Sequence, residues 1–157
     1  SEAGELAERV ERFELADFFG AEPGLGDELA HLRWPPDAGA RTWVHGDFHP
    51  DQVARVEGRS ILLDLDSLHV GRSADDLAGW IADHLFERPE LAFDAAASSL
   101  LEGYADAGGH VPEASFLRRL VGCELALRSA AALRRLEFGA LARARAGLAR
   151  ARELAWR

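Results

Sequence analysis

Residues 44–80 read VHGDFHPDQVARVEGRSILLDLDSLHVGRSADDLAGW, and they hold most of the information about the fold. Residues 42–45 predict a short strand, and the polar residues 46–52, which include a proline, predict a loop. Two apolar runs follow, at 53–56 and 60–65, and the Glu-Gly-Arg turn between them is typical of a β-hairpin. We therefore expect one small β element in the middle of the chain.

Helices are expected on both sides of this β element. Ser73, followed three positions later by Asp76, can form a capping box for a helix that ends near Glu87. Apolar spacing and breaker residues predict further helices at 5–19, 27–33, 90–107, 112–136 and 138–156. The sequence thus predicts a single domain over residues 1–157, of the α+β class and mostly α-helical.

The composition is typical of a globular protein. Hydrophobic residues make up 48% and charged residues 29% of the chain, and no apolar run approaches the roughly 20 residues that a spanning helix needs. The polar, acidic N-terminus is unlike a secretory signal peptide. Cys123, the single cysteine, has apolar neighbours and is expected to be a buried thiol in a reducing compartment. We expect a cytoplasmic protein with no membrane partner.

The charged residues limit the possible partners and the chemistry. A net charge of −9 weighs against nucleic acid as a partner. The repeated Ala-Arg pairs at 138–156 resemble a nucleic-acid-binding arm, but an amphipathic helix with a solvated Arg face is the preferred interpretation. All 18 basic residues are Arg, and the chain has no Lys. A mechanism that requires a lysine must therefore obtain it from outside this chain.

Two polar segments, 45–52 and 63–67, flank the expected hairpin. A two-stranded connection brings both segments to the same end of the β element, so that their carboxylates can converge. Phosphoryl transfer requires such an arrangement, because one carboxylate orients or deprotonates the acceptor hydroxyl while other oxygen ligands hold Mg²⁺ against the nucleotide phosphates.

The residue pattern itself resembles a known family. His45-Gly46-Asp47, then Gln52, Asp64, Gly71 and Asp76-Leu77-Ala78 are similar to the motifs of aminoglycoside phosphotransferases and choline kinases, which are relatives of protein kinases. The resemblance implies the C-terminal lobe of a protein kinase-like phosphotransferase, whose hairpin carries the catalytic and metal loops. It also implies transfer of a phosphoryl group from ATP, with Mg²⁺, to a hydroxyl of a small molecule such as an aminoglycoside, a sugar or choline.

The resemblance implies a role for each residue that matches a motif. Asp47 corresponds to the catalytic base, and Gln52 and Asp64 correspond to the two magnesium ligands. Gln52 stands where most of the family has Asn, and in this respect the chain resembles the maltokinase branch. Gly71-Arg72-Ser73 replaces the usual Gly-Asp-Pro, which leaves the geometry of that turn open.

Four further residues are expected to support the site. By resemblance, His45 packs beneath the catalytic loop, His49 lines the site, and Asp76 binds the backbone of the loop. Asp66 either assists the metal or caps a turn. The alternation of His45, Asp47 and His49 is also compatible with a zinc site.

A rival enzyme class fits part of the sequence. The apolar run into Asp64-Leu65-Asp66 resembles the opening motif of haloacid dehalogenase-type phosphatases, with Asp64 as nucleophile and Asp66 as acid/base. Those enzymes also need a basic residue and an acidic pair on later strands of a parallel sheet. The residues after Ser73 predict helices only, which weighs against this class.

The resemblance covers the C-terminal lobe alone. Only 43 residues precede Val44, and they show neither a glycine-rich phosphate loop nor a strand lysine. We expect the N-terminal lobe to come from elsewhere, in cis or in trans; the alternative is a catalytically incomplete module that binds a nucleotide or small molecule. The isolated chain is expected to bind Mg²⁺–nucleotide weakly and to turn over negligibly. The acidic side chains at positions 83, 87, 102 and 106 either face a cationic acceptor or are solvent charges.

Overall fold

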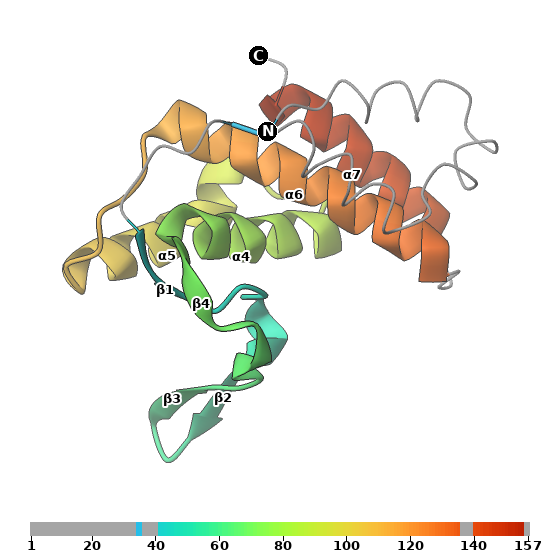
Figure 1. The fold of residues 1–157 in the computed structure, drawn as a ribbon. Coiled ribbons are helices and arrows are strands. Elements are labelled where there is room, and N and C mark those ends of the chain that lie inside the picture. Colours follow the sequence, from blue (N-terminus) through green and yellow to red (C-terminus); the bar gives the residue numbers. More distant parts are fainter. Residues whose placement is uncertain (1–33, 36–40, 136–139, 156–157) are drawn as a thin grey trace.

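The computed structural model describes residues 34–35, 41–135 and 140–155. Within them the protein is a small α+β domain, mostly helical, with two small antiparallel β ladders (Figure 1). The helices predicted at 5–19 and 27–33 lie outside the described residues. The predicted fold class, α+β and mostly helical, is confirmed.

The strands form two separate ladders. They are β1 (Arg41–Val44), β2 (Val53–Val56), β3 (Arg59–Leu62) and β4 (His69–Arg72). β1 pairs with β4 and β2 pairs with β3, both antiparallel, with Val44 opposite His69 and Val53 opposite Leu62. The prediction of a single β element was wrong, because β4 is only four residues long and carries no turn signal that separates it from the preceding loop.

The β2–β3 hairpin is shorter than the sequence predicted. Its turn is Glu57-Gly58, and both residues have positive φ, at 50° and 78°, as a tight two-residue hairpin turn requires. β3 ends at Leu62 rather than at Leu65, because Asp64 takes a left-handed conformation (φ 53°, ψ 65°) and the next three residues form a 3₁₀ turn. The hairpin projects away from the helices (Figure 1).

In the β1–β4 ladder, Gly71 of β4 lies very close to the side chain of Val44 in β1. A Cβ at this position would lie 2.7 Å from Cγ2 of Val44, which is closer than carbon atoms approach one another. Gly71 therefore lets β4 cross beside the buried end of β1. The chain then enters a helix directly at Ser73, with Arg72 as the N-cap residue.

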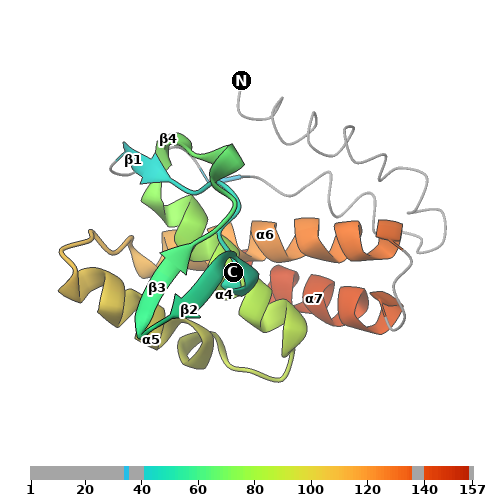
Figure 2. The same cartoon turned by 90° about the horizontal axis from the view of Figure 1, so that it is seen from below.

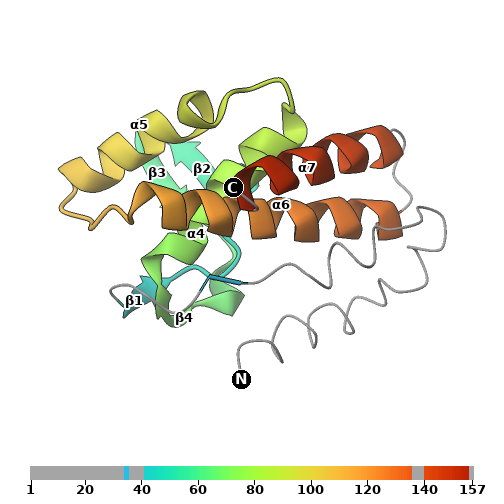
Figure 3. The ribbon, with the colours of Figure 1, turned by 90° about the horizontal axis from the view of Figure 1, so that it is seen from above.

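Four helices form the body of the described structure. They are α4 (Ser73–Glu87), α5 (Phe93–Asp106), α6 (Ala114–Arg135) and α7 (Ala140–Ala155). α6 and α7 run side by side, and α4 packs against both (Figure 3). The core lies at this junction, where Ile81, Leu85, Leu120, Val121 and Leu125 are fully buried. Each such side chain contributes about 1.5–3 kcal/mol through the hydrophobic effect.

The structure corrects the predicted helix boundaries. Ser73 caps nothing: it is the first residue inside α4, and no side-chain bond caps this end. α5 begins at Phe93 rather than at 90, after a turn in which the Leu91 amide donates to the Arg88 carbonyl. α6 begins at Ala114, and Glu113 rather than Pro112 organises its first turn by accepting bonds from the Ser115 hydroxyl and from backbone amides.

The strands and their loops expose an unusual amount of apolar surface. All but one of the exposed large apolar side chains found in the described part of the chain lie between residues 43 and 70. They are Trp43, Val56, Ile61, Leu62, Leu63, Leu65, Leu68 and Val70. Figure 2 gives a view from below of the two ladders and the connecting loops that contain these residues. Surface of this kind usually marks a contact site.

Among the described helices, none is both long enough and apolar enough to cross a membrane.

Candidate functional site

The order of strand pairing brings the two polar segments together. The chain passes from β1 through residues 45–52 into β2, and from β3 through residues 63–68 into β4. Because β1 pairs with β4 and β2 pairs with β3, both connecting loops run between the same two ladders. The Leu63 amide donates to the Gln52 carbonyl at 2.9 Å, which fixes one loop against the other. We call residues 45–52 the catalytic loop and residues 63–68 the metal loop, after the roles the resemblance implies.

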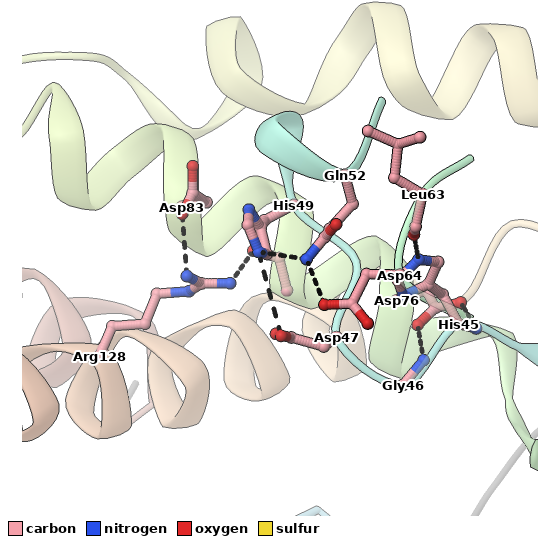
Figure 4. A network of polar contacts seen from close by, with 11 residues as sticks. His45, Gly46, Asp47, His49, Gln52, Leu63, Asp64, Asp76, Asp83 and Arg128 are labelled. Carbon is pink, nitrogen blue, oxygen red and sulfur yellow. Dashed lines mark hydrogen bonds and ion pairs between the residues drawn. The ribbon is translucent and has the colours of Figure 1, made fainter. Parts of the chain in front are cut away.

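Asp76 anchors the catalytic loop to helix α4. Its carboxylate accepts hydrogen bonds from the His45 amide at 2.6 Å and the Gly46 amide at 3.0 Å (Figure 4). This is the contact that the family resemblance implies for Asp76, and it replaces the capping box predicted from the sequence. A carboxylate that accepts two backbone N–H groups forms strong, charge-assisted bonds. The loop is therefore held by the first turn of α4.

The His45 side chain joins the catalytic loop to the metal loop. Its ring is buried, with Nε2 2.7 Å from the Leu63 carbonyl oxygen. Because a carbonyl only accepts, Nε2 carries the proton, and Nδ1 is a buried atom that has no hydrogen-bond partner in the described part of the chain. The ring also contacts Phe48, with centroids 5.8 Å apart. Since Leu63 directly precedes Asp64, His45 fixes the position at which the metal loop begins.

Gln52 and Asp64 face each other across the two loops. Gln52 Nε2 donates to Asp64 Oδ2 at 3.4 Å and lies 3.3 Å from Nε2 of His49 (Figure 4). A half-turn of the Gln52 amide exchanges its nitrogen and oxygen, so Oε1 can occupy the same position. One amide oxygen and one carboxylate suit Mg²⁺, which keeps several waters and takes its remaining ligands from phosphate. These residues therefore fit a magnesium ion.

Asp47 presents its carboxylate to solvent beside His49. The side chain of Asp47 is 63% exposed and that of His49 is 20% exposed, and His49 Nε2 lies 4.0 Å from Asp47 Oδ2. His49 is held through its backbone, because its carbonyl accepts the Gln52 amide at 2.9 Å. Asp47 is thus accessible to a hydroxyl group that approaches from solvent, while the His49 ring contacts both Asp47 and Gln52.

Asp66 stands apart from this group. It lies in the 3₁₀ turn of Leu65–Ser67, and in the described part of the chain no hydrogen bond links it to Asp47, Gln52 or Asp64. The residues that the structure describes also contain no group of three His, Cys, Asp or Glu side chains placed to hold a metal ion. His45, Asp47 and His49 do not form such a group, and the bond from Nε2 of His45 to Leu63 further disfavours the zinc interpretation.

Helix α4 contributes aromatic residues that the sequence analysis did not single out. The Phe48 ring packs on Trp80, with centroids 4.8 Å apart, and Trp80 packs on His84 at 5.5 Å. Trp80 and His84 are four positions apart and therefore share a face of α4. This helical spacing was the available signal, but nothing in the sequence placed Phe48 against that face.

Asp83, considered above as a contact for a cationic acceptor, has a partner within the protein. Its Oδ1 lies 2.8 Å from Nη1 of Arg128 on helix α6, and both side chains are about three-quarters buried, at 22% and 24% exposure. Arg128 also donates to the Gly79 carbonyl at 3.1 Å. No sequence signal identifies Arg128, because the contact depends on how α6 crosses α4.

Comparisons with protein-family models, curated proteins and solved structures find no match to this chain. The case for a function therefore depends on the residues and their geometry.

Proposed function

We propose that this chain supplies the catalytic-base and magnesium-binding lobe of an ATP-dependent small-molecule kinase. The observation that carries the proposal is the approach of Gln52 to Asp64, 3.4 Å across two loops, with Asp47 on the same loop as Gln52. Phosphoryl transfer needs these three groups: an acceptor-side carboxylate and two oxygen ligands for the metal. The resemblance of residues 45–78 to aminoglycoside phosphotransferases and choline kinases points to the same chemistry.

Each residue has a distinct part in the proposed reaction. Asp47 accepts the proton of the acceptor hydroxyl as that oxygen bonds to the γ-phosphorus and the bond to the β-phosphate oxygen breaks. Gln52 and Asp64 would hold Mg²⁺, which when bound supplies neutralisation of the phosphate charge. His45 and Asp76 fix the backbone that carries these groups, so the site requires little reorganisation on binding.

The remaining part of the site is proposed to come from a second lobe, in cis or in trans. The chain has no lysine to pair with the nucleotide phosphates. The exposed apolar side chains Ile61, Leu62, Leu63, Leu65 and Leu68 surround Asp64 in the sequence and give such a lobe a surface to cover. Positioning supplies most of the catalysis in phosphoryl transfer, so the chain alone is expected to bind Mg²⁺–nucleotide weakly and to turn over negligibly.

The acceptor is proposed to be a small molecule with a free hydroxyl. Asp83 is neutralised by Arg128 at 2.8 Å, so this carboxylate does not favour a cationic acceptor in the way that an unpaired one would. The Phe48 ring of the catalytic loop and the Trp80 ring of α4, which pack on each other, offer apolar contact area for the acceptor.

Two other functions have less support. A module that only binds a nucleotide has no need of Asp47, whose exposed carboxylate lies beside His49. A haloacid dehalogenase-type phosphatase would use Asp64 and Asp66 together on a parallel sheet, whereas both described ladders are antiparallel. Hydrolysis of p-nitrophenyl phosphate by the purified chain, lost on replacing Asp64, would favour the phosphatase.

The proposal is tested by calorimetric titration of Mg²⁺–ATP into the wild-type chain and the variants Asp64→Asn and Asp66→Asn. Asn tolerates the left-handed conformation of residue 64, so Asp64→Asn removes the charge without straining the backbone. Replacing the charged carboxylate ligand by a neutral amide is expected to weaken binding by about tenfold or more, at least the effect that changes in the supporting residues of metal sites have. Asp66→Asn should weaken binding much less. Equal losses in the two variants would refute the assignment of Asp64.

A further inference from the structure

The catalytic loop packs directly on helix α4. The loop contacts α4 at three positions that share one face: Asp76, which binds two loop amides, Gly79, and Trp80, which packs on the Phe48 ring. The place of Asp47, which lies between the anchored Gly46 and Phe48, therefore depends on the first two turns of this helix.

At Gly79 the loop sits directly on the backbone of α4. A Cβ on Gly79 would lie 3.2 Å from the Phe48 carbonyl oxygen, so the loop carbonyl occupies the space that a side chain would fill. Contacts this close transmit small shifts, because neither backbone can yield independently. A displacement of this turn of α4 would move Phe48 and, with it, its neighbour Asp47.

Arg128 holds this same turn of α4 from helix α6. Its Nη1 lies 2.8 Å from Asp83 Oδ1 (Figure 4). Its Nη2 donates to the Gly79 carbonyl at 3.1 Å. The Nη2 atom is also 3.9 Å from the Cβ position at Gly79 that the Phe48 carbonyl approaches. A planar guanidinium with two fixed contacts defines orientation as well as distance.

This contact is an expensive way to hold two helices together. Nε of Arg128 is buried and has no hydrogen-bond partner among the described residues, and an unsatisfied buried donor lowers stability. Apolar side chains such as Ile81 and Leu125 already pack α4 against α6, and replacing a buried ion pair by apolar residues often stabilises a protein. The geometric precision of the guanidinium, rather than its contribution to stability, therefore explains its presence best.

We propose that Arg128 is a positioning residue for the phosphoryl-transfer site. By holding Gly79 and Asp83 in place, Arg128 sets the distance between the catalytic loop and α4. It thereby sets the distances of Asp47 and Gln52 from Asp64. The functional part of this inference rests on the proposed kinase activity; the structural part does not.

Hydrogen exchange measured by mass spectrometry tests the structural part. Arg128→Met keeps the apolar stem and removes both contacts, while Arg128→Lys can restore only one of them at a time. Arg150→Met is the matched control. Arg150 also has an ion pair, to Glu153 at 2.6 Å, and a buried Nε that has no hydrogen-bond partner among the described residues. Its ion pair, however, lies within helix α7. All proteins are compared at a temperature where each is fully folded.

In Arg128→Met the amides of residues 46–52 should exchange about fivefold faster or more, the equivalent of losing one net hydrogen bond, while α7 stays protected. Arg128→Lys should show a smaller increase and Arg150→Met none in the loop. Unchanged loop exchange in Arg128→Met would overturn the inference. A uniform increase in the exchange rates of α4, α6 and α7 would also overturn the inference, because it would show that Arg128 acts only as a stabilising residue. Should Arg128→Met not fold, Arg128→Lys carries the same comparison.

Titration with Mg²⁺–ATP tests the functional part. Arg128→Met should bind severalfold more weakly than wild type, and Arg150→Met should bind equally well. If wild type binds and Arg128→Met binds with the same affinity, the positioning role is wrong and the proposed function stands. If wild type itself does not bind Mg²⁺–ATP, the proposed function fails, and the exchange experiment still decides whether Arg128 positions the loop.

Discussion

Gly46 occupies the tightest point of the catalytic loop, with a φ of +84° and the Ser67 carbonyl facing its Cα. A Cβ there would lie 2.6 Å from Ser67 O, a backbone atom of the metal loop that cannot move aside. Its own amide binds Asp76. The two loops can approach each other at this position because the residue has no side chain.

Replacing Gly46 by Ala should therefore destabilise the protein more than the backbone strain of its positive φ alone explains. The matched control is Gly58→Ala in the hairpin turn, where φ is +78° but nothing lies within 4 Å of the added Cβ. Both variants carry left-handed strain of about 1–2 kcal/mol, and Gly46→Ala adds the clash with Ser67. Urea denaturation measures the difference; equal losses of unfolding free energy would contradict the described contact between the loops.

At the residue scale the sequence was informative where motif spacing is fixed and uninformative where a contact is tertiary. The spacing of Asp47, Gln52 and Asp64 sufficed to select the three candidate residues, and strand pairing then accounts for the approach of Gln52 to Asp64. The capping box at Ser73 was a wrong prediction, because Asp76 directs its carboxylate to the catalytic loop instead. Arg128 was not predictable, since its partners are 45 and 49 positions away.

At the scale of elements, small residues set the spacing of α6 and α7. A Cβ on Gly122 would lie 2.8 Å from Cβ of Ala155, and 3.0 Å from both the Ala151 carbonyl oxygen and the Ala155 amide nitrogen. Two of these three atoms belong to the backbone of α7. The close contact between the helices, visible from two sides in Figures 1 and 3, therefore requires glycine at this position.

Gly122→Ala should lower the free energy of unfolding even though alanine favours helices. The helix preference would add about 1 kcal/mol of stability, but separating α6 from α7 exposes buried side chains, at a cost of about 1–3 kcal/mol typical of overpacked cores. Gly103→Ala in α5 is the control, since nothing lies within 4 Å of its Cβ and only the helix preference acts. The measurement is thermal unfolding. A Gly122→Ala protein as stable as Gly103→Ala would show that the helices do not pack as described.

Among the elements, α4 was predicted closely: its end at Glu87 was correct and its start was misplaced by one residue, because its apolar spacing is regular and Arg72 rather than Ser73 is the N-cap residue. β4 was missed because its pairing with β1 is a long-range contact: 24 residues and a complete hairpin separate Val44 from His69. The additional strand β4 does not alter the predicted site, because it begins after the polar segment 63–67 that the sequence had already singled out.

The single thiol reports on the whole molecule. Cys123 is buried in the core among α4, α6 and α7, and burial, reinforced by the nearby Glu124 carboxylate, raises the pKa of the thiol from 9.0 to about 12. Above about pH 9 the unfolded chain therefore loses a proton that the folded chain keeps. The folded state binds more protons in this range, so stability must fall as pH rises.

We expect the unfolding free energy of wild type to fall between pH 9 and 12 relative to that of Cys123→Ala, which has no thiol. The relative slope should approach about 1.4 kcal/mol per pH unit well above pH 9 and be absent below pH 8. Urea denaturation of both proteins at pH 7.5, 9 and 10.5 measures it, because these values lie below the pKa of about 12 that the thiol has in the folded protein. Parallel curves for the two proteins would show that the thiol is not buried in the core.

The whole chain is argued to carry one half of a kinase site, and the most direct test is the metal dependence of nucleotide binding. In that test ATP is titrated by calorimetry into the intact wild-type chain, once with excess Mg²⁺ and once with EDTA. Because Gln52 and Asp64 are expected to bind the nucleotide through the metal, saturable weak binding should occur with Mg²⁺ and vanish with EDTA. Equal binding under both conditions, or no binding in either, would contradict the account.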